Sequence, residues 1–231
     1  MEFDWKIILF IVIFISIGAV TIIIRLKQSK KLKDTWQKFA QSHGLTYTDD
    51  ISEVSEIKKL GDDQLEMLNK MKATGTFKMA AKLLGFNFLY GKYNGTDIRI
   101  YTIKKGRQGS TYTVYCVEVN FDKSLNLGLE IYKEGFFSKT GKLLGVQDIQ
   151  IGWKELDDLV MIKGNSEEAV QHFLNRDGVK EAIRDLISYE KTVNIDDTDI
   201  HFETGYDIMK DQDQLFGLLD KMTETMKKIK P

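Results

Sequence analysis

His201 and Glu203 are the two residues of this chain whose types and spacing could do acid–base or metal chemistry together. They are two positions apart in a segment where apolar residues alternate with polar ones, so both side chains would point to the same face of a strand. A histidine beside a carboxylate can transfer a proton or supply two ligands to a metal ion. One histidine and one carboxylate complete neither site, so a solvated pair on an edge strand is the simpler interpretation, and no catalytic or metal-binding residue is assigned.

The other residues capable of chemistry lie far apart in the sequence. His43 and His172 have no second metal ligand at helical spacing. Cys116 falls in the middle of a predicted strand, where a cysteine is usually an inert, small hydrophobic residue, whereas a nucleophilic cysteine needs a nearby histidine or helix N-terminus. A structure that gathers His172 or His201 with Cys116 or with two carboxylates would favour an enzyme. An exposed apolar groove without titratable groups would favour a binding module.

No segment matches a cofactor-binding motif, so no cofactor is predicted. Residues 135–142 superficially suggest a phosphate loop, but Leu143 replaces the hydroxyl residue that would bind magnesium. Gly106 and Gly109 lack the third glycine and the βαβ setting of a dinucleotide site. Calcium loops need oxygen ligands at alternating positions, whereas the carboxylates of this chain occur as adjacent pairs that point apart. These pairs are Asp49-Asp50, Asp62-Asp63, Asp157-Asp158 and Asp196-Asp197.

Alternating hydrophobicity predicts the strands that must position these residues. Apolar and polar residues alternate on both sides of Asn94-Gly95, a pair typical of two-residue hairpin turns. A second short turn over residues 105–109 leads to a strand over residues 111–121 that is rich in Thr, Tyr and Val. Consecutive short connections predict an antiparallel meander, because parallel strands need long crossovers. Further strands are predicted over residues 127–133, 148–151 and 159–162, with a closing hairpin over 193–195 and 200–203.

Helical periodicity predicts the remaining elements. A helix over residues 29–43 stops at Gly44, and two short helices lie within residues 50–75. Asn165 opens a helical region with Glu168 in the capping-box position. The last helix, residues 211–229, has an apolar stripe that suits packing on the sheet better than a short coiled coil with a second copy, because two heptads are few.

Residues 7–24 form an uncharged, apolar run that is long enough, as a helix, to span a thin bilayer. The acidic residues before the run and the lack of a small-residue cleavage site disfavour a signal peptide. The sequence therefore predicts one transmembrane helix. Its membrane-interface residues would be Trp5, Arg25, Lys27, Lys30, Lys31 and Lys33. Lys and Arg are concentrated after the run, which predicts the inner (plasma) membrane as the location, with the C-terminal domain in the cytoplasm.

Charge and cysteine content limit the partners. Residues 25–38 carry a net charge of +5, while residues 39–231 carry −5. An acidic body argues against nucleic acid, and the basic stretch suits anionic lipid headgroups. The single cysteine cannot form an internal disulfide, as expected in a reducing compartment. The expected partners are a lipid bilayer and a protein, which could be a second copy of this chain. The helix over residues 29–43 either docks on the domain or lies on the membrane surface, and its narrow apolar stripe favours docking.

Three short motifs follow the apolar run of residues 7–24 along the chain. They are a Trp36-containing helix ending in Gly44-Leu45, a Leu89-Tyr90-Gly91-x-Tyr93-x-Gly95 hairpin and an Asp148-Ile149-x-Ile151-Gly152 step. This order resembles that of a group of uncharacterised bacterial single-pass membrane proteins over most of the chain. The resemblance supports the fold and supplies no site residue, because that group has no established activity.

Together these patterns predict an α+β protein with an N-terminal transmembrane helix and a largely antiparallel sheet domain with packed helices. The predicted organisation is an anchor over residues 1–27, a helical connector over 28–75 and an antiparallel α+β domain over 76–231. The expected function is a membrane-tethered, non-catalytic interaction module that recognises a protein through a sheet edge or an apolar groove. The alternative is a membrane-anchored hydrolase whose residues come from distant positions. Carriage of a lipid or small ligand in a sheet-lined cavity is a third, less favoured hypothesis.

Overall fold

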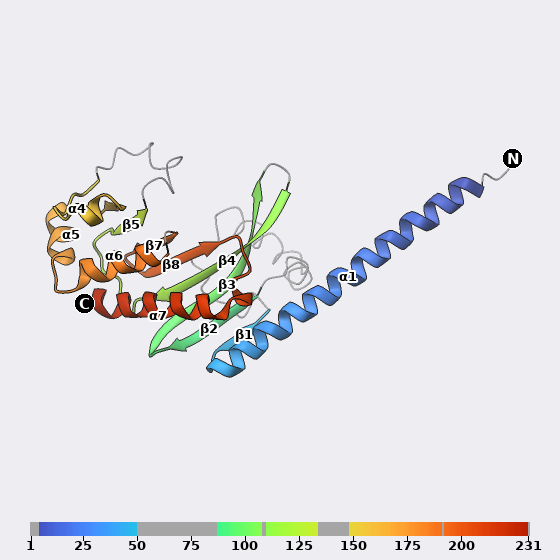
Figure 1. Ribbon diagram of the computed structural model, residues 1–231, viewed down its shortest axis with the longest axis horizontal. Helices are drawn as coiled ribbons and strands as arrows, with labels where there is room; N and C mark the ends of the chain where they lie inside the picture. The colour runs from blue at the N-terminus through green and yellow to red at the C-terminus, as the bar shows by residue number, and fades with distance from the viewer. Residues whose placement is uncertain (1–4, 50–86, 108–109, 134–147, 191, 231) are drawn as a thin grey trace.

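The computed structural model describes residues 5–49, 87–107, 110–133, 148–190 and 192–230 (Figure 1). Its strands form one 8-stranded sheet in the order β1-β2-β3-β4-β8-β7-β5-β6. Every pairing between described strands is antiparallel. Helices pack on this sheet. The protein therefore has the α+β class that the strand and helix periodicities of the sequence predict.

The predicted hairpin is present at the centre of the first half of the sheet. Asn94 and Gly95 have φ angles of 49° and 80°, the left-handed values that a tight two-residue hairpin turn requires. They join β2 (Phe88–Tyr93) to β3 (Thr96–Arg107). The other strands are β1 (Thr46–Thr48), β4 (Ser110–Asn120), β5 (Glu130–Lys133), β6 (Val160–Lys163), β7 (Val193–Asp196) and β8 (Asp199–Thr204).

The predicted hairpin over residues 193–195 and 200–203 is confirmed, because β7 pairs with β8. This hairpin lies within the sheet and not at its edge, because β8 also pairs with β4. One strand prediction is wrong. Residues 148–151 form no strand. Instead, the Ile149 N–H donates to the Ile162 carbonyl, and the Asp148 carboxylate accepts the Ile162 N–H, both at 2.8 Å. This segment therefore bonds to the outer side of β6 without continuing the ladder.

The helices after residue 165 begin near the predicted positions, whereas α1 begins well before residue 29 and the short helix α4 was not predicted. Ser166, one residue after the predicted Asn165, caps α5 by accepting the Ala169 N–H, and Asp211 caps α7 by accepting the Gln214 N–H. The helices are α1 (Trp5–His43), α4 (Lys154–Asp157), α5 (Glu167–Leu174), α6 (Val179–Tyr189) and α7 (Gln212–Ile229), with a 3-10 turn, η3 (Ile208–Lys210).

One face of the sheet carries the main hydrophobic core. The last helix, α7, buries Leu215, Leu219, Met222, Met226 and Ile229 in that core, so its stripe packs within the chain and is not available for a coiled coil. At the C-terminal end of α1, Trp36 and Phe39 are buried in the same core, and Phe39 stacks on Phe216 with ring centroids 5.5 Å apart. The docking prediction for residues 29–43 is therefore confirmed (Figure 1).

The transmembrane anchor is the main correction. The helix α1 continues without a break from the apolar run through the lysines and onto the sheet. Among the residues that were described, no helix combines the length and the apolar character needed to cross a membrane. This finding contradicts the predicted anchor over residues 1–27 and the assignment to the inner membrane with a cytoplasmic C-terminal domain. The prediction was based on the hydropathy, length and flanking residues of the run over 7–24, and a helix that is apolar all round is also found packed against protein.

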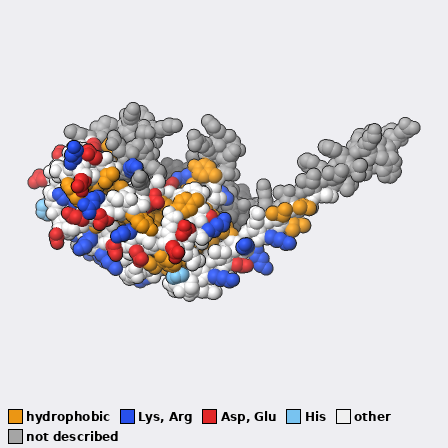
Figure 2. Space-filling view, viewed as in Figure 1, with side chains coloured by type: hydrophobic (Ala, Val, Ile, Leu, Met, Phe, Trp, Pro, Cys, Tyr) orange, Lys and Arg blue, Asp and Glu red, His pale blue; other side chains and the backbone are white. Residues whose placement is uncertain are grey.

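Charges of both signs are mixed on the face of the body shown in Figure 2, while lysine and arginine side chains gather on α1 where it leaves the sheet. The predicted helices within residues 50–75 and the glycine-containing segment 135–142 lie outside the described residues.

Candidate functional site

The insertion of β8 beside β4 brings His201 and Glu203 next to residues from two other strands. In the register of the sheet, His201 is opposite Glu118 and Glu203 is opposite Cys116. On the other side of β4, Cys116 is opposite Tyr101. Residues directly opposite each other share one face, and here it is the face turned away from the main core. We call this group the polar cluster; it consists of Arg99, Tyr101, Lys105, Cys116, Glu118, His201 and Glu203.

The imidazole of His201 lies between two carboxylates. Its Nδ1 atom is 3.3 Å from Oε1 of Glu118, and its Nε2 atom is 3.2 Å from Oε1 of Glu203. The Tyr101 hydroxyl donates to the same Glu118 oxygen at 2.6 Å, and the Lys105 ammonium donates to Oε2 of Glu203. Each carboxylate is thus held by a second group besides the histidine.

The two carboxylates fix the protonation state of this histidine. Burial would lower the pKa of His201, but the close carboxylates of Glu118 and Glu203 outweigh burial and raise the pKa to about 9. Burial would likewise raise the pKa of Glu203, but the bonds from His201 and Lys105 lower it to about 2. At neutral pH the cluster therefore holds an imidazolium, which cannot act as a general base.

Cys116 is not activated as a nucleophile. Its side chain is fully buried, and burial together with the charge of Glu203 raises the pKa of the thiol. Burial and the charge of Glu118 also raise the pKa of Tyr101, which therefore stays protonated and donates its hydrogen bond. In this state the positive charge of His201 and Lys105 neutralises the buried carboxylates of the cluster. Its sulfur, nitrogen and oxygen donors are also of the kinds that bind metal ions.

The predicted solvated edge pair is wrong, because His201 and Glu203 lie on a central strand and their side chains are only 13% and 26% exposed. The pairing of β4 with β8 spans a long stretch of sequence, and periodicity carries no information on such pairings. One local signal did exist. Glu118 stands between Val117 and Val119 in an otherwise apolar strand, and a carboxylate in such a position needs a buried partner.

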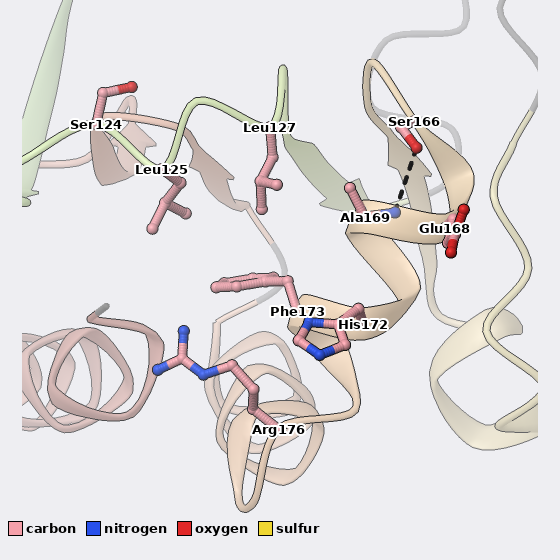
Figure 3. A pocket seen from close by; sticks show the side chains of 9 residues that line it. All are labelled: Ser124, Leu125, Leu127, Ser166, Glu168, Ala169, His172, Phe173 and Arg176. Atoms are coloured by element: carbon pink, nitrogen blue, oxygen red, sulfur yellow. Dashed lines mark hydrogen bonds between the residues drawn. The ribbon is translucent and has the colours of Figure 1, made fainter.

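A second site lies at the other end of the sheet. A cavity of about 660 Å³ opens between residues 124–127 and α5. Figure 3 shows Leu125 and Leu127 on one side of it and Phe173, His172 and Arg176 on the other. The lining combines apolar side chains with a guanidinium group, and Glu168 also contributes to it.

Asp197 holds the wall of this cavity in place. Its carboxylate accepts the N–H groups of Leu127, Gly128 and Leu129 at 3.2, 2.8 and 2.9 Å. The chain can turn there because Gly128 has a φ angle of 62°. The Asn165 N–H also donates to the Leu127 carbonyl at 2.7 Å. Residues 124–129 are therefore fixed from the β7–β8 turn on one side and from the start of α5 on the other.

Arg176 is held at the opposite wall. Its guanidinium donates to the carbonyls of Ile229 and Lys230 at 3.3 and 2.6 Å, next to the C-terminal end of α7. The guanidinium carbon is 5.4 Å from the centroid of the Phe173 ring, within cation–π range. The charged group therefore lies beside the apolar part of the cavity in a defined orientation.

The predicted membrane-interface residues whose side chains the structure describes, Lys27, Lys30, Lys31 and Lys33, are in neither site. Lys33 forms an ion pair with Asp49 at 2.7 Å, and Lys27, Lys30 and Lys31 are exposed on α1. The side chains of Trp5 and Arg25 lie outside the described part of the structure. Their assignment as interface residues depended on the anchor that the structure contradicts. Of the other histidines, His172 lines the cavity, and His43 packs against the rings of both Phe39 and Phe216.

Comparisons with protein-family models, curated proteins and solved structures found no match to this chain. The resemblance to single-pass membrane proteins thus stays a prediction, and function has to be argued from the two sites.

Proposed function

We propose that the protein is a non-catalytic binding module that takes a peptide segment of a partner protein into the cavity beside α5. The observation that carries this proposal is the pairing of an apolar wall with a fixed guanidinium in one open cavity. Apolar contacts supply most of the free energy of binding at such sites, while a few polar groups set the orientation and specificity.

The protonation states in the polar cluster argue against the alternative, a hydrolase. The gathering of His201 with Cys116 and two carboxylates is the arrangement expected for an enzyme. However, a hydrolase of the cysteine type needs a thiolate, which a neighbouring imidazolium or another cation stabilises. Here the thiol of Cys116 keeps its proton, because burial and the charge of Glu203 raise its pKa.

Binding through a sheet edge has less support than binding in the cavity. At one end of the sheet, Asp148 and Ile149 already bond to the outer side of β6. At the other end, β1 spans only three residues, which offers few backbone hydrogen bonds to an added strand.

The chemistry of the lining indicates the kind of segment that would bind. Leu125, Leu127 and Phe173 suit an apolar side chain. A guanidinium has five N–H donors. Among the described residues, the backbone carbonyls of Ile229 and Lys230 accept hydrogen bonds from two donors of Arg176. The remaining donors can bind a carboxylate. We therefore expect a segment with a large apolar residue next to Asp, Glu or a C-terminal carboxylate.

This preference can be tested with labelled hexapeptides that are randomised at two neighbouring positions. Their binding to the full chain is measured by fluorescence anisotropy. We expect selection of an apolar residue followed by an acidic one. Ala169 lines the cavity, so Ala169→Phe should fill it and weaken binding of the best peptide at least about 10-fold, which corresponds to about 1.4 kcal/mol. Arg176→Gln should remove the preference for the acidic residue.

Arg184→Gln is the matched control, because Arg184 lies on α6 in ion pairs with Glu155 and Asp185 and does not line the cavity. It should leave binding unchanged. Thermal melts of all three variants separate lost binding from lost folding. The proposal fails if no peptide is selected or if Ala169→Phe binds the selected peptide as the unmodified chain does.

A further inference from the structure

The polar cluster contains three different metal-binding atoms close together. The thiol sulfur of Cys116, a ring nitrogen of His201 and a carboxylate oxygen of Glu203 all lie within 4.8 Å of one another. In a tetrahedral zinc site with bonds of about 2.0–2.3 Å, the ligand atoms are roughly 3.3–3.8 Å apart. Side-chain movements of about 1 Å would therefore be enough to bring these three atoms around one ion.

We propose that Cys116, His201 and Glu203 bind a divalent transition-metal ion of the zinc type. A thiolate, an imidazole and a carboxylate are the three donor types that Zn²⁺ uses in proteins, and the thiolate disfavours Mg²⁺ and Ca²⁺. Three protein ligands leave the fourth position of a tetrahedral ion to water.

The surroundings of His201 support binding through its Nε2 atom. Nε2 faces Glu203, and Cys116 is the register partner of Glu203, so all three ligands lie at one end of the ring. At the other end, Nδ1 faces the Glu118 carboxylate. A carboxylate that accepts the second N–H of a metal-binding histidine fixes its tautomer and orientation. Glu118 is itself oriented by the Tyr101 hydroxyl.

A second group of possible ligands, Glu118, Asp199 and His201, lies within the same 4.8 Å limit. It is the weaker candidate, because it lacks the thiolate that would favour a zinc-type ion.

A divalent ion that binds to Cys116, His201 and Glu203 displaces any proton from the thiol sulfur and from Nε2, because atoms that bind a metal must be deprotonated. The Lys105 ammonium, which donates to Glu203, is then a competitor for that carboxylate.

To test this proposal, the full chain is prepared with an affinity tag that contains no histidine and is stripped of metal with a chelator. It is then titrated with Co²⁺. We expect one equivalent to bind with a sulfur-to-cobalt charge-transfer band in the near ultraviolet. Cys116→Ser should abolish this band. Glu203→Gln should weaken binding at least about 10-fold, and Glu118→Gln, which removes the orienting carboxylate, by about 10- to 100-fold.

Two further variants make the test specific. His172→Gln is the matched control, because His172 lines the cavity and lies outside the cluster, and it should not change the titration. Lys105→Met should tighten Co²⁺ binding several-fold, whereas a purely structural role of Lys105 predicts no such gain.

Zn²⁺ should also raise the melting temperature of the unmodified chain and leave that of Cys116→Ser unchanged. The proposal is overturned if stoichiometric Co²⁺ gives no charge-transfer band, or if the band persists in Cys116→Ser. Should Cys116→Ser fail to fold, the opposite shifts expected from Glu118→Gln and Lys105→Met decide the question.

Discussion

At the scale of single residues, His201 shows how a buried charge is maintained. Taking an imidazolium out of water is costly, and this cost is offset only because two carboxylates lie at hydrogen-bond range from its two nitrogens. If the histidine lost its proton, the two carboxylates would lose the cation between them and would keep only Arg99 and Lys105 as positively charged neighbours. The stability of the metal-free protein should therefore depend on pH in a way that can be assigned to this cluster.

The first prediction concerns that pH dependence. Because the pKa of His201 is about 9 in the folded chain against 6.5 in the unfolded chain, the free energy of unfolding should fall as pH rises from 6.5 to 9. For one proton the slope is at most about 1.4 kcal/mol per pH unit. The pKa of Glu203, about 2 against 4.5, adds stability that is present above pH 4.5 and lost as pH falls towards 2.

Urea unfolding of the chelator-treated chain at several pH values measures this effect. Stability should be highest between about pH 4.5 and 6.5. His201→Gln should flatten the alkaline limb, since glutamine has no charge to lose. If the curves of the variant and the unmodified chain run parallel above pH 6.5, His201 is not the group responsible.

A second residue-scale prediction concerns Asp197, whose carboxylate accepts three backbone N–H groups at the cavity wall. Asp197→Ala should lower the free energy of unfolding by about 2–4 kcal/mol, because it leaves donors without their acceptor. It should also weaken peptide binding, since Leu125 and Leu127 lose their support. Chemical denaturation and anisotropy measure the two effects. Glu130→Ala is a suitable control, because Glu130 is exposed and pairs with Lys163 at 3.7 Å.

At the scale of elements, the C-terminal part of α1 is an integral part of the core. Trp36→Ala should destabilise the protein by about 3–5 kcal/mol, the range for removing a fully buried tryptophan side chain. Lys30→Ala, on an exposed position of the same helix, should change stability by less than about 0.5 kcal/mol. Thermal and urea unfolding give both values, and equal effects of the two substitutions would contradict the docking of α1.

Sequence patterns predict the elements of this protein better than their arrangement. The turn at Asn94-Gly95 and the apolar stripe of α7 are determined by residues close together in the sequence. Turn chemistry and periodicity are therefore sufficient to predict them. The neighbours of β8 depend on contacts with β4 far away in the sequence, and the polar cluster forms only through those contacts. For this reason His201 and Glu203 could be singled out as a pair, while their burial and their partners could not be predicted.

At the scale of the whole molecule, we expect that folding requires the C-terminal part of α1 but not its N-terminal part. A chain of residues 28–231 keeps Trp36 and Phe39 and should melt cooperatively near the temperature of the full chain. A chain of residues 46–231 removes both and exposes the core under α1, so it should lose the cooperative transition. Calorimetry of the two fragments tests this. A cooperative melt of the shorter fragment would mean that α1 is dispensable for folding.

The central place of β8 also has a consequence for the time course of biosynthesis. The β3 side of β4 can pair as soon as the meander leaves the ribosome, but the other side must wait for a strand about 80 residues further on, since Asn120 pairs with Asp199. At about 5–20 residues per second, that side stays open for roughly 4–16 seconds. During this interval Glu118 has no histidine opposite it, and an unpaired strand edge can join the edge of another nascent chain. The speed of translation between the two strands should therefore influence how much of the protein reaches the native state.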